Sequence, residues 1–357
     1  VVGVLTAFFA ATIGLFQYDI KKVLAYSTVS QLGYMFVGVG SGAYWAGIYH
    51  LLTHAVFKAC LFLGSGSVIL GCHHEQDMRK MGGLKKYMPV TYWTCLVGTL
   101  ALIGFPGLAG FYSKDMIIEV VHGIGTPLSG IVYWALLIGV FVTSLYSFRL
   151  FFMVFHGRER FDEKVRSHLK ESPYVVIVPL IALAIPSVFA GGLLVEAALF
   201  KGFFGQSIFV EESRDVLSML GENFGGALAM ISHSFVTLPF WFAVGGIIVA
   251  WYFYVKEPNL ATSVVSRCTI LHQVLLEKYG FDRFNSWFFS QGARVSGQLL
   301  WKKGDVVMID GVLVNGSAKL IETMAHVVRK LQTGYLYHYA FGLIAGLLIF
   351  LVLFVYF

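Results

Sequence analysis

Three titratable side chains recur four residues apart in one apolar segment, at His50, His54 and Lys58. In an α-helix this spacing places them on one face, about 6 Å apart along the axis. An imidazole, and a lysine amine in an apolar environment, can each take up and release a proton near neutral pH. Together the three groups therefore predict a proton relay. For His50 taken alone, a hydrogen-bonded contact between helices is the commoner role and stays open.

A lysine and an aspartate follow a helix-breaking sequence in GFPGLAGFYSKDMIIE. Pro106 and three glycines come directly before Lys114 and Asp115, so we expect a break within a membrane helix over 89–121. Unpaired backbone at membrane depth is tolerated only inside protein or beside water, and ion transporters place charges at such breaks. The alternative is a hairpin between two short spans, with the lysine and aspartate as a pair at the membrane interface.

Two further groups of polar residues have weaker interpretations. Asp19, Lys21 and Lys22 begin a polar entry to the apolar segment that follows them. Lysines at a membrane edge commonly extend to water, so a pathway mouth is the less favoured interpretation on position alone. The run Cys72-His73-His74-Glu75 has no second ligand group at suitable spacing, and the four cysteines form no CxxC pair, so we predict no metal site.

The composition assigns the chain to the membrane proteins. Of its 357 residues 57% are hydrophobic and 13% charged, and the mean hydropathy is +0.74, whereas soluble domains have about 25% charged residues. The sequence holds no GxGxxG after a strand, no P-loop and no GxSxG. We therefore expect an integral membrane protein that binds no nucleotide and forms no acyl-enzyme.

Eight segments are long and apolar enough to cross a bilayer. They are 1–17, 22–40, 44–71, 89–121, 130–155, 174–199, 236–255 and 337–357. We therefore expect an all-α integral membrane protein with about eight transmembrane helices, one of them broken. The first segment has no initiator Met, basic stretch or cleavage site, so it is not predicted to be a signal peptide. We expect the chain to be the C-terminal part of a longer protein.

The basic residues set an orientation. When Lys22, at the very start of the second segment, is counted with the connection before it, 21 of the 26 Lys and Arg residues lie in the connections after the first, third, fifth and seventh segments. Only Lys201 and Arg214 lie in the alternate ones. This asymmetry follows the positive-inside rule, which places the basic connections in the cytoplasm and the C-terminus on the outer side. The remaining three are Lys58, Lys114 and Arg149, of which Arg149 either extends to the cytoplasmic water or serves a relay.

The connection 256–336 is far too long for a turn. Its ten Lys and Arg residues have aromatic and aliphatic residues between them, which is typical of an amphipathic helix on a membrane or along a partner. Gly304, Gly311 and Gly316 weaken a single straight helix. The alternative is a small cytoplasmic loop domain.

Four segments resemble a known family. They are QYDIKKVLAYSTVSQLGYM (17–35), HLLTHAVFKACLFLGSGSVI (50–69), CHHEQDMRKMGGL (72–84) and FPGLAGFYSKDMI (105–117). They are similar to the proton-translocating antiporter-like subunits of NADH:quinone oxidoreductase, respiratory complex I. The third segment, the long linker and the final span favour the longer member of that family over its shorter paralogues.

The resemblance implies a division of the chain into four parts. These would be the second antiporter-like repeat at 1–155, further transmembrane helices at 156–255, a cytoplasmic-side linker with a long lateral amphipathic helix at 256–336, and an anchoring helix at 337–357. The family's first repeat would precede Val1, so we expect half of the proton path to lie outside this chain.

The resemblance also implies roles for particular residues. The positions that match functional ones in the family are Lys114, Asp115, Lys58, His54, His50, Asp19 and Lys21. Lys114 would be the lysine of the broken helix and Asp115 its neighbour. Lys58 and the two histidines would form the central polar axis, and the last two residues would lie at the cytoplasmic mouth.

The activity implied by the resemblance is proton translocation driven by electron transfer from NADH to quinone. NADH, FMN, iron–sulfur clusters and quinone would bind to partner subunits, and this chain would carry no cofactor. Its partners would be other membrane-arm subunits, contacted in part by the lateral helix, and the lipid of a bacterial inner membrane, with no nucleic acid. Two alternatives stay open: the large subunit of a multi-subunit Na⁺/H⁺ antiporter, and a structural clamp.

Overall fold

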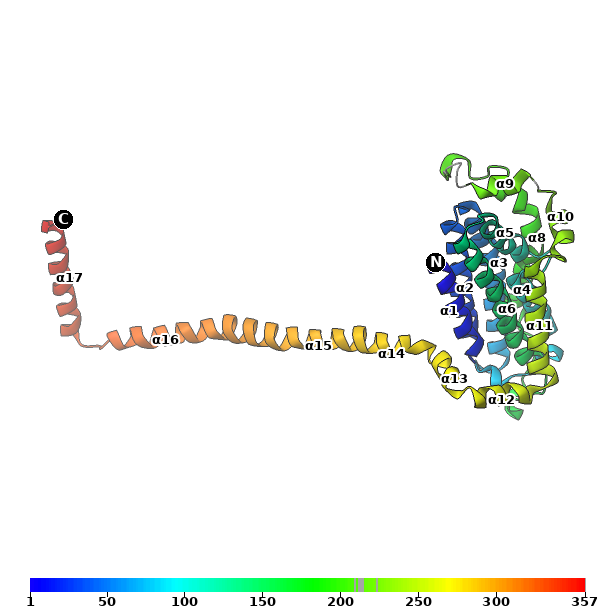
Figure 1. The fold of residues 1–357 in the computed structure, drawn as a ribbon. Coiled ribbons are helices and arrows are strands. Elements are labelled where there is room, and N and C mark those ends of the chain that lie inside the picture. Colours follow the sequence, from blue (N-terminus) through cyan, green and yellow to red (C-terminus); the bar gives the residue numbers. More distant parts are fainter. Residues whose placement is uncertain (209, 211–214, 223, 357) are drawn as a thin grey trace. The chain divides into compact units, whose positions relative to one another are not determined.

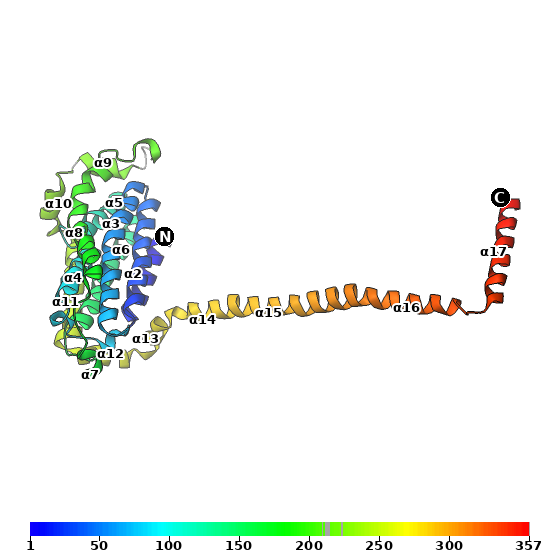
Figure 2. The ribbon, with the colours of Figure 1, turned by 180° about the vertical axis from the view of Figure 1, so that it is seen from behind.

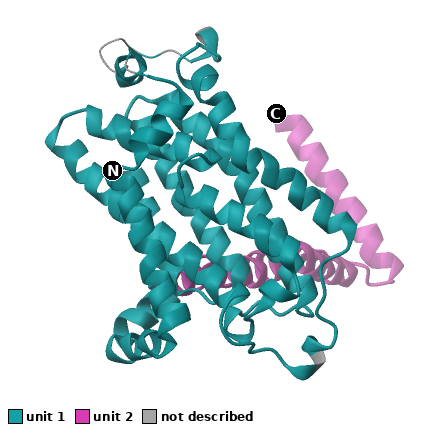
Figure 3. Ribbon diagram, turned by 90° about the vertical axis from the view of Figure 1, so that its right-hand side faces the viewer, with its two compact units in different colours: residues 1–279 teal, residues 280–357 magenta. Residues whose placement is uncertain are grey.

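A computed structural model of the protein describes residues 1–208, 210, 215–222 and 224–356, so the predicted outer-side residue Arg214 and the terminal Phe357 lie outside the described residues. Within these ranges the regular structure is helical, apart from one isolated β-bridge between Asp19 and Asp77. The chain divides into two compact units, residues 1–279 and 280–357 (Figure 3). Each unit is described by itself.

Unit 1 is a bundle of apolar helices with short helices at its ends (Figures 1 and 2). The long helices are α1 (Val2–Phe16), α2 (Ile20–Gly40), α3 (Tyr44–Gly71), α4 (Pro89–Ile103), α5 (Ala109–Gly123), α6 (Pro127–Phe155), α8 (Tyr174–Leu199) and α11 (Leu238–Trp251). The short ones are α7 (Glu163–Arg166), α9 (Val216–Glu222), α10 (Ala227–Ser234), α12 (Pro258–Arg267) and α13 (Thr269–Leu276). Helices α9 and α12 lie at opposite ends of the bundle.

The length and hydropathy of these helices identify a multi-pass membrane protein. Among the described residues, five helices are long and apolar enough to cross a membrane: α3, α6, α8, Leu238–Lys256 and α17 (Leu336–Tyr356) of unit 2. Helices α1 and α4 are apolar but shorter. The predicted all-α membrane class is therefore confirmed, whereas the count of eight spans stays a prediction.

Small residues allow the first two helices to cross closely. A Cβ atom added at Gly33 of α2 would lie 2.6 Å from the Gly3 carbonyl oxygen and 2.8 Å from the Ala7 Cα atom of α1. No real side chain fits at such distances, so the two backbones touch at this point. Close contact through glycine is a common way to associate helices in membranes, where apolar surface alone gives little preference for protein over lipid.

The interruption predicted within 89–121 is present as two separate helices. Helix α4 ends at Ile103, and Gly104 follows in the left-handed conformation with φ of 81°. Gly107 also has a positive φ, of 87°, and α5 begins at Ala109. Pro106 cannot donate a helical hydrogen bond, and the two glycines adopt backbone angles that other residues avoid. This short segment therefore ends α4 and separates it from α5.

Capping side chains move two helix starts away from the predicted positions. Helix α2 begins at Ile20 rather than at residue 22, because the Asp19 carboxylate accepts hydrogen bonds from the Lys21 and Lys22 backbone amides at 2.8 and 3.2 Å. Helix α6 begins at Pro127 rather than at 130, because Thr126 and Ser129 form a reciprocal capping box.

The connections 72–88 and 156–173 are tied to each other and to α4. Glu171 accepts hydrogen bonds from the Val90 backbone amide at 2.7 Å and the Thr91 hydroxyl at 2.6 Å, and so caps the first turn of α4. An ion pair joins Lys86 to Glu159. Glu75, from the CHHE run, pairs with Lys80 at 2.8 Å, and this hydrogen bond lowers the pKa of the Glu75 carboxyl.

Unit 2 consists of helices with exposed sides. Its segments are α14 (Phe281–Asn285), a π-helical segment Ser286–Gln291, α15 (Gly292–Leu299), a π-helical segment Leu300–Asn315, α16 (Gly316–Leu331) and α17. None of these segments has a buried residue among those described. The helical path continues through Gly304, Gly311 and Gly316, since the wider π-helical turns of 300–315 include the first two.

Candidate functional site

Two lysines are buried within the helix bundle of unit 1. Lys58 of α3 is 4% exposed and Lys114 of α5 is fully buried. An ammonium group in an apolar bundle costs several kcal/mol unless polar groups or water compensate it, so buried lysines in membrane helices mark functional sites by default. The surroundings of the two lysines differ.

Lys58 has a conventional hydrogen-bond partner. Its Nζ atom donates to the Leu24 carbonyl oxygen of α2 at 3.1 Å. This carbonyl also accepts from the Thr28 hydroxyl at 3.0 Å. The amine is therefore held against the backbone of a neighbouring helix, where its charge is partly compensated by a carbonyl dipole.

The predicted column of titratable groups is present on α3. His50 is fully buried and His54 is 4% exposed, and the centroids of the two imidazole rings lie 6.0 Å apart, which matches the spacing of about one helical turn. The Nε2 atom of His54 has no hydrogen-bond partner in the part of the chain that the structure describes. The column runs along α3 from Lys58 to His50, which contacts Ser113 of α5.

His50 joins three helices through side-chain hydrogen bonds. Its Nε2 atom lies 3.1 Å from the Gln31 amide oxygen of α2, and its Nδ1 atom lies 2.8 Å from the Ser113 hydroxyl of α5. Because an amide oxygen only accepts, the Nε2 atom carries the hydrogen, and in the neutral ring Nδ1 accepts from the serine. The Ser113 oxygen lies 2.7 Å from the Thr53 hydroxyl. His50 is thus both a helix contact and the centre of a hydrogen-bonded chain.

Lys114 follows Ser113 on α5, directly after the break. Its Nζ atom lies 4.9 Å from the centroid of the Tyr34 ring, and no hydrogen-bond partner is found for it among the described residues. No ion pair within the described ranges joins it to Asp115. Lys114 is thus fully buried among the helices without an ion pair to its neighbour, and both interpretations of the break stay predictions.

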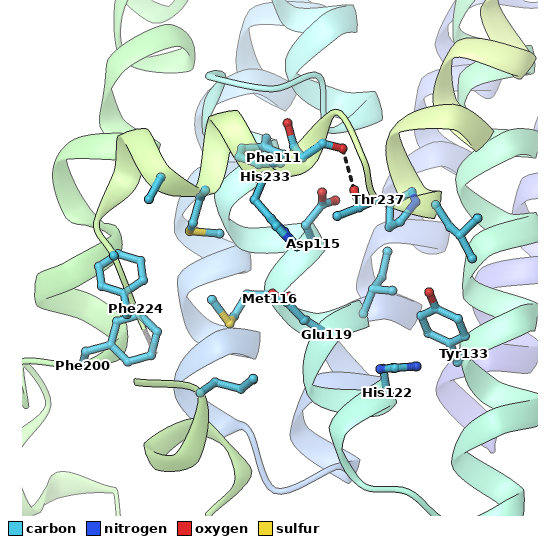
Figure 4. Close-up of a pocket in the computed structure, with 18 residues that line it drawn as sticks. Phe111, Asp115, Met116, Glu119, His122, Tyr133, Phe200, Phe224, His233 and Thr237 are labelled. Atoms are coloured by element: carbon cyan, nitrogen blue, oxygen red, sulfur yellow. Dashed lines mark hydrogen bonds between the residues drawn. The ribbon is translucent and has the colours of Figure 1, made fainter. Parts of the chain in front are cut away.

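Asp115, the residue after Lys114, lines a cavity beside α5 (Figure 4). The cavity has a volume of about 590 Å³ and is lined mainly by apolar and aromatic side chains from α5, α9, α10 and their neighbours. Its titratable residues include Asp115, Glu119 and His122 of α5 and His233 of α10. Protons could therefore be exchanged between carboxylates, imidazoles and any water in this space.

The sequence interpretation missed Glu119, His122 and His233. The first two follow Asp115 at spacings of four and seven, so helical periodicity places them on the same face and could have identified them. His233 lies on a short helix more than one hundred residues along the chain, and no local pattern connects it to α5.

Three other polar residues from the sequence analysis, Arg149, Asp19 and Lys21, do not join the histidine column. Arg149 is 2% exposed, and its Nη1 atom donates to the Gln17 carbonyl oxygen at 2.6 Å, so it neither extends to water nor joins the histidine column. Asp19 caps α2, and Lys21 is exposed at the same helix end. The last two residues do not join the buried group formed by His50, His54, Lys58 and Lys114.

Comparison with known proteins gives matches over nearly the whole chain. Residues 1–158 match the family described as "NADH:quinone oxidoreductase/Mrp antiporter, TM". NADH-quinone oxidoreductase subunit L of Neisseria meningitidis serogroup B is 45% identical over 368 residues, an alignment that covers 98% of this chain and 55% of that protein. The protein of the same name from Rhodobacter capsulatus is 36% identical over 412 residues, covering 97% and 57%.

A eukaryotic relative gives a similar result. NADH-ubiquinone oxidoreductase chain 5 of Marchantia polymorpha is 38% identical over 355 residues, which covers 98% of this chain and 52% of the relative. The chain spans about half the length of the curated relatives that it matches. The family resemblance seen in the sequence is therefore confirmed.

Proposed function

On the premise that the chain is a homologue of NADH-quinone oxidoreductase subunit L over nearly all its residues, we propose that it is part of a proton-translocating membrane subunit of that enzyme, respiratory complex I. Electron transfer from NADH to quinone on partner subunits would drive proton movement through the buried lysine and histidine side chains. The observation that carries this proposal is the pair of buried lysines, Lys58 and Lys114, at the two ends of one polar group.

The distances support a proton path in steps. From Lys58 the path follows His54 to His50, whose ring contacts Ser113 at 2.8 Å. Lys114 is the next residue of α5, and its other neighbour Asp115 lines the cavity with Glu119 and His233. In this proposal the lysines change protonation state in turn, and protons leave through the cavity. Asp19 and Lys21 would lie at the cytoplasmic mouth, as the family resemblance implies.

We propose the orientation and the span count from the sequence. The chain would have about eight transmembrane helices, with α4 and α5 as the halves of the broken one. By the positive-inside rule the basic connections would then lie in the cytoplasm and the C-terminus on the outer side of a bacterial inner membrane. The segment 281–331 would be the lateral amphipathic helix on the cytoplasmic side. Its exposed apolar side chains, such as Trp287, Leu320 and Ile321, suit contact with other membrane-arm subunits and lipid.

The cofactors of the reaction would belong to partner subunits. The sequence offers no nucleotide-binding motif for NADH or FMN and no cysteine pattern for an iron–sulfur cluster. The contribution of this chain would be limited to binding and moving protons.

The decisive experiment replaces Lys114 by alanine in the full-length protein, within the assembled complex. We expect NADH-driven proton uptake by inverted membrane vesicles to fall by roughly tenfold or more, because a positioned proton carrier is lost. The control is Lys80→Ala, since Lys80 is exposed in the connection 72–88. Normal proton uptake by an assembled Lys114→Ala complex would contradict the proposal.

The family description also names the Mrp antiporter, so the Na⁺/H⁺ antiporter is the second candidate. An antiporter would dissipate a pH gradient on addition of Na⁺ without NADH, whereas we expect no such response. The third candidate, a structural clamp, predicts that deleting 280–357 prevents assembly while Lys114→Ala pumps normally. The two variants together therefore separate the clamp from the proton channel.

A further inference from the structure

The side chain of Lys114 rests on an aromatic ring. Its Nζ atom lies over the face of Tyr34, 4.9 Å from the ring centroid, and this distance is within the range of cation–π attraction. Tyr34 belongs to α2 and is fully buried. The two residues come from helices separated along the chain by all of α3 and α4, so only the folded bundle brings them together.

The position of the ring is fixed at its far end. The Tyr34 hydroxyl donates a hydrogen bond to the Leu136 carbonyl oxygen of α6 at 2.8 Å. Gly139, on the same helix, leaves the space for it, since an added Cβ atom would lie 2.5 Å from the phenol oxygen. With one end of the ring held by a hydrogen bond and the other by the backbone of α2, the aromatic face is presented to Lys114 in one orientation.

An aromatic face attracts an ammonium group without accepting its protons in the way that a carbonyl or carboxylate oxygen does. Lys58 differs in this respect, because its Nζ atom donates to a carbonyl oxygen at 3.1 Å. The groups that interact electrostatically with Lys114 include His50 of α3, Asp115 of α5 and Tyr34 itself, and Tyr146 of α6 interacts with the Tyr34 ring. In the observed position none of these makes a hydrogen bond to the amine.

We propose that Tyr34 is a positioning residue for proton transfer, and that its ring face holds the charged Lys114 side chain at a resting position between the His50–Ser113 chain and Asp115. This inference rests on the proposed proton-channel function. The ring stabilises the ammonium form while keeping its protons unshared. A short movement of the flexible lysine stem then brings the amine to a donor on one side or an acceptor on the other.

The test varies the electron density of the ring at nearly constant shape. In the full-length protein within the assembled complex, Tyr34 is replaced by phenylalanine and then by mono-, di- and trifluorinated phenylalanine. We expect Tyr34→Phe to retain most NADH-driven proton uptake in inverted vesicles. Each added fluorine should lower proton uptake further, because fluorine weakens cation–π attraction. The trifluorinated ring should reduce uptake by about tenfold in all. If phenylalanine prevents assembly, fluorinated tyrosines, which keep the hydroxyl, give the same series.

Tyr49 provides the matched control. It is 1% exposed, and its hydroxyl donates to the Gly191 carbonyl oxygen at 2.6 Å, but among the described residues no Lys or Arg lies over its ring. The fluorine series at this position should leave proton uptake unchanged. A flat response at Tyr34, or equal responses at the two positions, would overturn the inference.

A Lys114→Met variant in the same strain separates the two levels of the argument. If the methionine variant pumps normally, the proposed function itself is wrong. If it does not pump while the fluorine series at Tyr34 is flat, the proton channel stands and the role of Tyr34 is wrong.

Discussion

The two units of the chain differ in where their side chains find partners. Unit 1 buries lysine, histidine and serine side chains among its own helices, and several of them, such as His50 and Lys58, bond to groups on another helix. Helices of unit 2 bury none of their described residues, although α16 carries an apolar side chain at nearly every third or fourth position. A helix that buries nothing gains little beyond its own backbone hydrogen bonds. Unit 1 is therefore stabilised from within, whereas unit 2 depends on what surrounds it.

The largest difference in stability between the two units should come from replacing one glycine in each unit by a larger residue. We expect Gly33→Leu to destabilise the protein by about 3 kcal/mol or more, because the new side chain would overlap the backbone of α1. We expect Gly297→Leu in α15 to be neutral or slightly stabilising, because nothing lies within 4 Å of its added Cβ atom and leucine favours helix. Thermal unfolding of the purified protein in detergent measures both.

Equal destabilisation by the two leucines would break this comparison. It would mean that α15 packs against protein even in the isolated chain.

A smaller effect is expected from removing one hydroxyl in each unit. Ser113→Ala leaves the His50 Nδ1 atom buried without its partner, and we expect a loss of about 1–3 kcal/mol of unfolding free energy. Ser317→Ala removes an exposed hydroxyl that donates to the Val314 carbonyl oxygen, and we expect a change within about 0.5 kcal/mol. The measurement is the same thermal unfolding, and a Ser113→Ala protein as stable as the parent would show that water replaces the hydroxyl.

The smallest effect is expected at the surface of unit 1, where Glu75 pairs with Lys80. The hydrogen bond from Lys80 lowers the pKa of Glu75 in the folded protein, so its contribution is present at neutral pH. It is lost as the pH falls below the ordinary carboxyl value of about 4.3 and through the lowered one. Glu75→Gln should therefore increase amide hydrogen exchange in the connection 72–88 at pH 7.

The same substitution should make no difference once the carboxyl is protonated. Exchange in the parent and in Glu75→Gln is expected to converge under strong acid, below the lowered pKa. A difference that persisted there would assign the effect to side-chain shape instead of charge.

Local patterns in the sequence predicted the features that lie within one helix. A spacing of four placed His50, His54 and Lys58 on one face of α3, and the structure has them there. Pro106 between glycines predicted the interruption between α4 and α5. In both cases the physical cause is short-range backbone geometry, which neighbouring residues determine.

Features that depend on contacts between distant segments were not predictable in this way. Tyr34 has nothing in its local sequence that assigns it to Lys114, and His233 joins the cavity from another part of the chain. Arg149 was expected either to extend to water or to serve a relay, but the end of α1 supplies a buried carbonyl for it.

The cap that Glu171 places on α4 has a consequence for biosynthesis. The carboxylate lies 81 residues after the Val90 amide that it binds, and ribosomes add about 5–20 residues per second, so roughly 4–16 seconds separate their synthesis. Throughout that interval the first amides of α4 must bind water or lipid headgroups. The helix before the break therefore acquires its final cap only after α5, α6 and the connection 156–173 have been synthesised.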